Sequence, residues 1–238
     1  VVIAAIMLMD ALLGASKLGY ASRELYSGTV LYIFIFALIT AAPFNAVLSR
    51  YMSDVIYNET YDDILPCYYV GLLLNLIFSC MLGIPFCVWE YLKGGVSLRF
   101  IFAGYCGYVI VVIVFYTMMY LSICKAYTKI AGFFIIGMVI TILSSIVFVY
   151  FFRWSTPISM LTALDIGFCM IASLEWAQIK SYFRRSSKRY KQVFHFMGKY
   201  WQLIFTNFFY MLGLYVHNFV FWTTDLRMEV AGTFVSAP

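Results

Sequence analysis

Charge is scarce in this sequence. Asp, Glu, Lys and Arg together make up 11% of its 238 residues, whereas a soluble domain carries about 25%. Hydrophobic residues make up 64%, and the mean hydropathy is +0.90. A chain of this length cannot hide so much apolar surface from water, so part of that surface must face lipid. This composition excludes a secreted disulfide scaffold, a disordered chain and a nucleic-acid-binding domain.

Residues that carry catalysis or hold metals are also few. There are two histidines, and none of the six cysteines forms a Cys-x-x-Cys pair. The cysteines lie in or at the ends of apolar runs, so we expect buried, free thiols. The sequence has no phosphate-binding loop, no dinucleotide fingerprint and no nucleophile elbow. We therefore expect no enzyme, no metal and no cofactor.

Seven apolar stretches reach or approach the 20 or so residues that a helix needs to cross a bilayer. They cover residues 1–13, 28–48, 67–89, 98–123, 130–152, 156–179 and 200–222. Runs such as Val109–Phe115 do not alternate in polarity, so spanning strands are not expected. We predict an all-α, multi-pass membrane protein, and the short first stretch suggests a fragment of a longer chain. Pro43 and Pro85 are expected to kink or break their helices.

Basic residues gather between the sixth and seventh stretches. This segment holds seven of the 16 Lys and Arg residues: Lys180, Arg184, Arg185, Lys188, Arg189, Lys191 and Lys199. Loops on its side of the membrane carry ten basic residues, against six on the other side. The positive-inside rule therefore places the segment and the N-terminus in the cytoplasm. Without this segment the count is three against six, so the orientation depends on it.

The basic segment also has the pattern of an amphipathic helix. At 100° per residue, one face collects the apolar residues Phe183, Tyr190, Val193, Phe194, Met197 and Trp201. Such a helix lies in the headgroup layer and attracts anionic lipid. We expect headgroup contacts from Arg184, Arg185, Lys188, Arg189 and Lys191. An ordinary charged loop is the alternative.

Asp165 is the most informative polar residue within a span, because a charge inside the bilayer is costly and usually faces a bundle interior or water. It shares a helical face with Thr162, Cys169 and Ser173, so we take Asp165, Thr162 and Ser173 as candidates that line a transport cavity. A hydrogen bond that fixes helix packing is the alternative. Glu175, interpreted as lying on the opposite face, is expected to reach toward Lys180 and the headgroups.

Two other spans carry polar strips. In the third span, small or polar residues recur every four positions: Gly71, Asn75, Ser79 and Gly83. This spacing predicts close helix packing, and Asn75 is also a cavity candidate. In the seventh span, polar residues follow one side of the helix: Asn207, Tyr210, His217 and Asn218. A cavity lining and interhelical hydrogen bonds explain these equally well.

The stretch after the second span carries a recognisable motif. It reads Ser-Arg-Tyr-Met-Ser-Asp from position 49, followed by Tyr57, Tyr61 and Ile-Leu-Pro from position 64. This resembles the T/S-R-Y-x-x-D…Y…I-L-P stretch of the PelG family of exopolysaccharide exporters. Residues 174–183 and 213–222 resemble the end of that family's sixth helix and its seventh helix. The likeness continues in register over most of the chain.

This resemblance implies the architecture of polysaccharide flippases and multidrug antiporters, in which two six-helix lobes are joined by a cytoplasmic connector. Residues 1–179 would form the first lobe, 180–199 the connector, and 200–238 the first helix of a truncated second lobe of a protein with about twelve helices. It implies an inner-membrane exporter with a polysaccharide substrate, a cytoplasmic glycosyltransferase partner and other membrane subunits. Arg50 and Asp54 match the family motif and are expected to pair, serving packing or gating.

Other functions remain open from the residues alone. A cation-coupled small-molecule antiporter of the same fold would concentrate carboxylates in its first lobe, and only Asp165 stands out at mid-membrane. A membrane glycosyl- or acyltransferase would need a His/Asp or Asp/Asp constellation at one membrane face. The cytoplasmic acids cluster at Asp54, Glu59, Asp62 and Asp63, but no histidine accompanies them.

Overall fold

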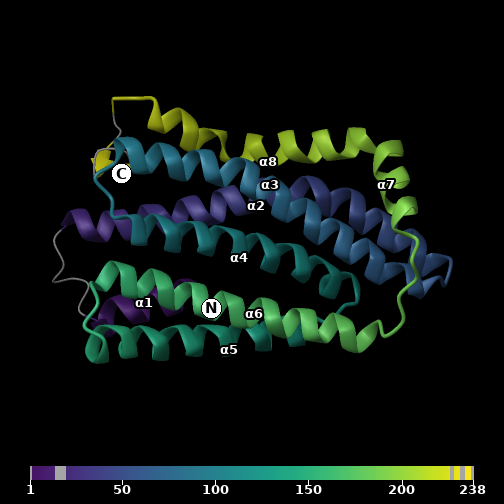
Figure 1. The fold of residues 1–238 in the computed structure, drawn as a ribbon, viewed down its shortest axis with the longest axis horizontal. Helices are drawn as coiled ribbons and strands as arrows, with labels where there is room; N and C mark the ends of the chain where they lie inside the picture. The colour runs from purple at the N-terminus through teal and green to yellow at the C-terminus, as the bar shows by residue number, and fades with distance from the viewer. Residues whose placement is uncertain (1, 14–19, 226–227, 231–233, 237–238) are drawn as a thin grey trace.

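The computed structural model describes residues 2–13, 20–225, 228–230 and 234–236 (Figure 1). In these ranges, six helices are long and apolar enough to cross a membrane. They are α2 (Tyr20–Tyr57), α3 (Ile64–Lys93), α4 (Leu98–Ile123), α5 (Tyr127–Ile146), α6 (Thr156–Tyr182) and α8 (Trp201–Trp222). A shorter α1 (Val2–Leu13) precedes them, and α7 (Tyr190–Lys199) links α6 to α8. The prediction of an all-α, multi-pass membrane protein is confirmed.

The helices lie side by side along the long axis of the molecule (Figure 1). The central helix is α2, which packs against α3, α4 and α8, while α6 packs against α4 and α5. With 38 residues, α2 is about 57 Å long, well beyond the roughly 30 Å of a bilayer's hydrocarbon core. One or both ends of α2 therefore extend past the apolar layer.

Short turns end the helices. The turns after α2, α4 and α5 each place one residue in the left-handed region: Glu59, Lys125 and Arg153. A 3-10 turn, η2 (Tyr61–Asp63), leads into α3, and a π turn, η3 (Val147–Phe151), closes α5. Pro43 and Pro85 both lie inside continuous helices. Neither proline breaks its helix, although each removes one backbone donor, and the alternative expectation of a kink stays a prediction.

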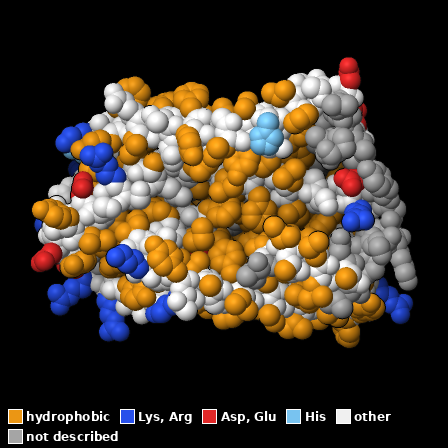
Figure 2. Space-filling view, turned by 180° about the vertical axis from the view of Figure 1, so that it is seen from behind, with side chains coloured by type: hydrophobic (Ala, Val, Ile, Leu, Met, Phe, Trp, Pro, Cys, Tyr) orange, Lys and Arg blue, Asp and Glu red, His pale blue; other side chains and the backbone are white. Residues whose placement is uncertain are grey.

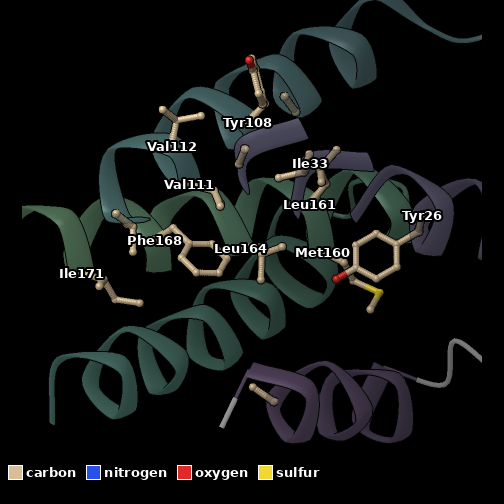
Figure 3. Close-up of a cluster of buried hydrophobic side chains, with 14 of the residues drawn as sticks. Tyr26, Ile33, Tyr108, Val111, Val112, Met160, Leu161, Leu164, Phe168 and Ile171 are labelled. Atoms are coloured by element: carbon tan, nitrogen blue, oxygen red, sulfur yellow. The ribbon is translucent and has the colours of Figure 1, made fainter. Parts of the chain in front are cut away.

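The hydrophobic core has two parts. The first joins α2, α4 and α6 through residues such as Ile33, Val111, Leu164 and Phe168, with α1 and α5 at its edge (Figure 3). The second lies at the end of the bundle where α7 packs, and it includes Met52 and the α7 residues Val193 and Met197. Hydrophobic side chains cover the middle of the outer surface, and most Lys and Arg lie at the α7 end (Figure 2). This distribution fits a protein that crosses a bilayer along its long axis.

A short hairpin follows α8, and no sequence pattern predicted it. Strand β1 (Met228–Val230) pairs antiparallel with β2 (Phe234–Ser236), with Met228 opposite Ser236. Both strands lie against α2. The strands have only three residues each, which is too short for a clear alternation of polarity.

Candidate functional site

Asp165 lies on the buried side of α6, with 8% of its surface exposed. Its Oδ1 is buried and has no hydrogen-bond partner among the described residues. The carboxylate faces α4 and α2: a Cβ atom placed on Gly107 would come 2.5 Å from Oδ1 and 3.2 Å from the Cδ1 of Ile33. Gly107 therefore makes the room that the carboxylate occupies, and the sequence analysis did not select it.

The other members of the predicted stripe on α6 do not gather around Asp165. Thr162 is half-buried, whereas Cys169 and Ser173 are exposed. The Ser173 hydroxyl donates to the Cys169 carbonyl oxygen at 2.8 Å, within its own helix. The structure therefore brings Asp165 toward α2 and α4 and leaves Ser173 on an outer face.

Glu175 departs most from expectation. It has no exposed surface, and neither carboxylate oxygen has a hydrogen-bond partner among the described residues. Lys180 instead places its ammonium 4.3 Å from the centre of the Trp176 ring. The prediction that Glu175 reaches toward Lys180 and the headgroups is wrong, because Glu175 shares the buried side of α6 with Asp165, Phe168 and Ile179. Helix α6 thus holds two buried carboxylates.

The small-residue seam of α3 is confirmed. Gly71, Asn75, Ser79 and Gly83 are all buried. A Cβ on Gly83 would come 2.7 Å from the Tyr105 ring, so the seam lets α4 approach closely. Asn75 donates to the Gly71 carbonyl oxygen at 2.8 Å inside this seam. This position favours packing for Asn75, and its role in a cavity stays a prediction.

The polar residues of α8 point in different directions. Asn207 donates from Nδ2 to the Ala42 carbonyl oxygen of α2, which is an interhelical hydrogen bond. Tyr210 is 60% exposed on another side of the helix. Asn218 and the exposed His217 contact each other at 3.1 Å between Nδ2 and Nε2. The packing interpretation thus holds for Asn207.

Arg50 and Asp54 do not form the expected ion pair; within the described chain no salt bridge joins them. The Arg50 guanidinium instead lies 4.5 Å from the centre of the Tyr200 ring, just before α8 begins. The prediction of an Arg50–Asp54 lock is wrong, because a cation over an aromatic face gives Arg50 a different partner. Arg50 therefore links α2 to the C-terminal end of the connector.

The connector is helical only over α7, since residues 183–189 are irregular. The predicted amphipathic helix is confirmed for residues 190–199, but Val193 and Met197 pack into the protein core, while Phe194 is half-exposed. The connector is also fixed by Asp63, which is 5% exposed in η2. Ser187 donates its hydroxyl to Asp63 Oδ1, and Arg189 lies 3.6 Å from Oδ2. The Ser187 N–H donates to the Asp62 carbonyl oxygen at 2.8 Å.

A cavity of about 210 Å³ opens between α2, α3 and α4. Its walls are mainly aromatic and apolar, and include Tyr32, Phe36, Phe86 and Tyr105. Glu90 also lines it. No single aromatic residue could be selected for this role from sequence, because the choice depends on which three helices meet.

Metal binding finds no support in the described part of the chain, where no three His, Cys, Asp or Glu side chains gather. All six cysteines are free. Of these, Cys67 is buried, whereas Cys80 and Cys169 are exposed, so the expectation of buried thiols is wrong for these two. The exposed pair lies on membrane-spanning helices, where apolar surroundings suit a thiol.

The whole length of the chain matches one known family. The family model described as "PelG: Putative exopolysaccharide Exporter (EPS-E)" matches residues 1–238. The chain belongs to the PelG family. No curated protein and no solved structure matches it. The resemblance drawn from the Arg50 motif is therefore confirmed, and the family is described as an exporter.

Proposed function

We propose that this chain is part of an inner-membrane exporter that moves an exopolysaccharide, or a lipid-linked sugar, out of the cytoplasm. The observation that carries this proposal is the family match over the whole length of the sequence. The six apolar helices support it, since a polymer exporter must span the membrane. The mechanism would be alternating access, in which helical lobes rock around a site between them.

The orientation is proposed from charge. The connector and the turn between α2 and α3 lie at the same end of the bundle, where Ser187 and Arg189 meet Asp63. Because basic segments stay in the cytoplasm, this end and the start of α1 would face inward. Arg184, Arg185, Lys188 and Lys191 are exposed there and are free to contact anionic headgroups. Arg189 forms an ion pair with Asp63, and we propose that it also contacts lipid headgroups.

The transport role of individual residues is proposed on their burial. An ionisable side chain inside a membrane-spanning helix is costly and commonly marks a substrate or ion path. Asp165 fits this pattern because its Oδ1 has no hydrogen-bond partner among the described residues. Thr162, Ser173, Asn75, Tyr210, His217 and Asn218 remain cavity candidates in a complete two-lobe protein. The aromatic cavity adds ring faces such as those of Tyr32 and Tyr105, on which sugar rings can pack.

Coupling to a cation is a second candidate function within the same fold, and one observation favours it. From sequence, Asp165 alone stands out as a mid-membrane acid, but Glu175 is also buried in α6, and both of its carboxylate oxygens lack hydrogen-bond partners in the described structure. Two such groups on α6 are typical of proteins that move protons or ions. We propose that the exporter uses them to couple polymer movement to a cation.

Partners follow from the chemistry of export. A polymer is made from activated sugars in the cytoplasm, so we propose that a glycosyltransferase docks at the connector end. Other membrane subunits of the same apparatus would contact the exposed side of α8, which carries large apolar side chains such as Phe209 and Leu214. Asp54 and Arg50 lie near this end and would serve gating or packing.

The experiment is a secretion assay in cells that lack the native gene. Asp165→Asn should reduce secreted polymer strongly at normal protein level in the membrane, because the amide keeps the shape and loses the charge. Asp62→Asn is the matched control, since Asp62 is exposed. Unchanged secretion with Asp165→Asn would remove Asp165 from the path, and full secretion without the protein would overturn the export function.

A further inference from the structure

A groove lies where α7 crosses the cytoplasmic end of α2. It has a volume of about 500 Å³ and is lined by Tyr51, Lys191, Gln192, His195, Phe196 and Lys199. Lys191, His195 and Lys199 are spaced by four residues, so they follow one side of the helix in successive turns. Only Lys191 is shared with the cations proposed above to contact headgroups. The groove is therefore a separate feature of the connector.

The two lysines of the groove add charge to α7 that no acidic side chain in the described part of the chain compensates. In the described structure, neither Lys191 nor Lys199 has a carboxylate partner within salt-bridge distance. The nearby acid Asp63 is occupied by Ser187 and Arg189. The positive charge of the groove is thus left for a ligand to neutralise.

The floor of the groove is aromatic. Tyr51 is 8% exposed, and its ring packs edge-on against Phe196 at 5.1 Å between centroids. Next to the groove, the centre of the Tyr200 ring lies 4.5 Å from the Arg50 guanidinium carbon and 5.3 Å from the Lys199 ammonium nitrogen. The Arg50 guanidinium is thus one further positive charge beside the same surface. Cations around an aromatic floor suit an anion that is attached to a flat or apolar body.

We infer that this groove binds a phosphate-bearing ligand, with Lys191, His195 and Lys199 contacting the phosphate oxygens. Ammonium groups bind phosphate as point charges, through charge-assisted hydrogen bonds. The groove exceeds the size of one phosphate and falls in the range of small-molecule sites. The phosphate can come from an anionic lipid headgroup or from a soluble nucleoside diphosphate. A lipid headgroup would make the groove sensitive to the composition of the membrane, and a nucleoside diphosphate would make it sensitive to the supply of activated sugar. Either role goes beyond export itself.

The test uses the full protein in lipid nanodiscs. In the soluble arm, pyrophosphate and ADP are titrated into nanodiscs of neutral phosphatidylcholine. In the lipid arm, nanodiscs that contain phosphatidylglycerol are compared with neutral ones by native mass spectrometry of retained lipid. The variant is the double change Lys191→Gln and Lys199→Gln. The matched control is the double change Lys125→Gln and Lys129→Gln, an equal loss of charge at two exposed residues outside the groove.

In one of the two arms, the double variant in the groove should weaken binding at least tenfold, while the control double variant changes it less than twofold. Loss in the soluble arm identifies a nucleotide-like ligand, and loss in the lipid arm identifies a headgroup. Equal losses in the control and the double variant would overturn the inference, because the effect would then be general surface charge. Absence of saturable binding in both arms would also overturn it. The single variants and His195→Gln keep the test valid if the double variant fails to fold.

Discussion

A close crossing of α5 and α6 gives the sharpest prediction. Gly137 of α5 and Gly167 of α6 face each other so closely that a Cβ on Gly167 would lie 2.7 Å from the Gly137 carbonyl oxygen. A Cβ on Gly137 would lie 2.8 Å from the Gly167 carbonyl oxygen. The side chain of Thr141 would also contact a Cβ on Gly167. Both helices therefore need glycine at this crossing.

The change Gly167→Ala should destabilise the packing of α5 against α6. Ordinary contact begins at 3.4 Å, so the backbones must separate by about 0.7 Å to admit the methyl group. A gap of 0.5–1 Å loses about a quarter to a half of the dispersion energy of the atoms that line it. Overpacking of this kind costs about 1–3 kcal/mol. Alanine's better helix propensity offsets at most about 1 kcal/mol of that.

The assay is equilibrium unfolding of the purified protein by SDS in mixed micelles. Gly132→Ala in the neighbouring helix α5 is the control, because a Cβ at Gly132 meets nothing within 4 Å. The control should be neutral or slightly stabilised, and Gly167→Ala should unfold at lower SDS. Equal stability of the two variants would refute the reasoning that this crossing is tight.

Four further predictions follow from other contacts. Asp63→Asn should release the connector and speed tryptic cleavage at the exposed Arg184 and Arg185. Asp62→Asn should not change the cleavage rate, because only the backbone carbonyl of Asp62 contacts Ser187. Equal cleavage rates in the two variants would contradict the docking of the connector on Asp63. Asn207→Leu should weaken the packing of α8 on α2 by roughly 0.6 kcal/mol in SDS unfolding, against no change for the exposed Tyr210→Phe. Tyr116→Phe should lower the free energy of unfolding by about 1 kcal/mol in the same assay, because the Tyr116 hydroxyl donates to the Tyr68 carbonyl oxygen and contacts the Tyr120 hydroxyl. Equal stability of Tyr116→Phe and the exposed control Tyr150→Phe would argue against that network. Tyr200→Leu should lower stability by about 0.5–1 kcal/mol by removing the ring under Arg50, and a double variant with Arg50→Gln should show no additional loss.

The spans could be predicted from sequence because lipid imposes one simple rule on every helix. The predicted stretch 98–123 has the bounds of α4, and 200–222 differs from α8 by one residue. The end of α2 was missed because the apolar run stops at Leu48, while the helix continues to Tyr57 through polar residues that water can solvate. Hydropathy identifies the residues that lie in the apolar layer of the bilayer, and a helix can continue beyond that layer.

The candidate site was harder to predict because a helical wheel gives direction but not neighbours. Asp165 and Glu175 are ten residues apart, which is about 80° on a wheel, so both fit one broad buried side. Interpreting them as opposite faces led to the wrong position for Glu175. The tight crossing of α5 had a signal that went unused: Gly137, Thr141 and Ser145 repeat the four-residue spacing that identified the α3 seam. The groove at α7 could not be found without knowing that Tyr51 lies beneath it.

The helix α8 follows the connector in sequence, yet it is fastened to α2 along its whole length. Arg50 meets Tyr200 at one end, Asn207 meets Ala42 in the middle, and Trp222 lies 4.7 Å from Tyr32 at the other end. A body held at three levels moves as one piece. If export involves two parts that swing against each other, the joint between them cannot be the connector; it must lie after Trp222, or α8 must peel away from α2 during each cycle.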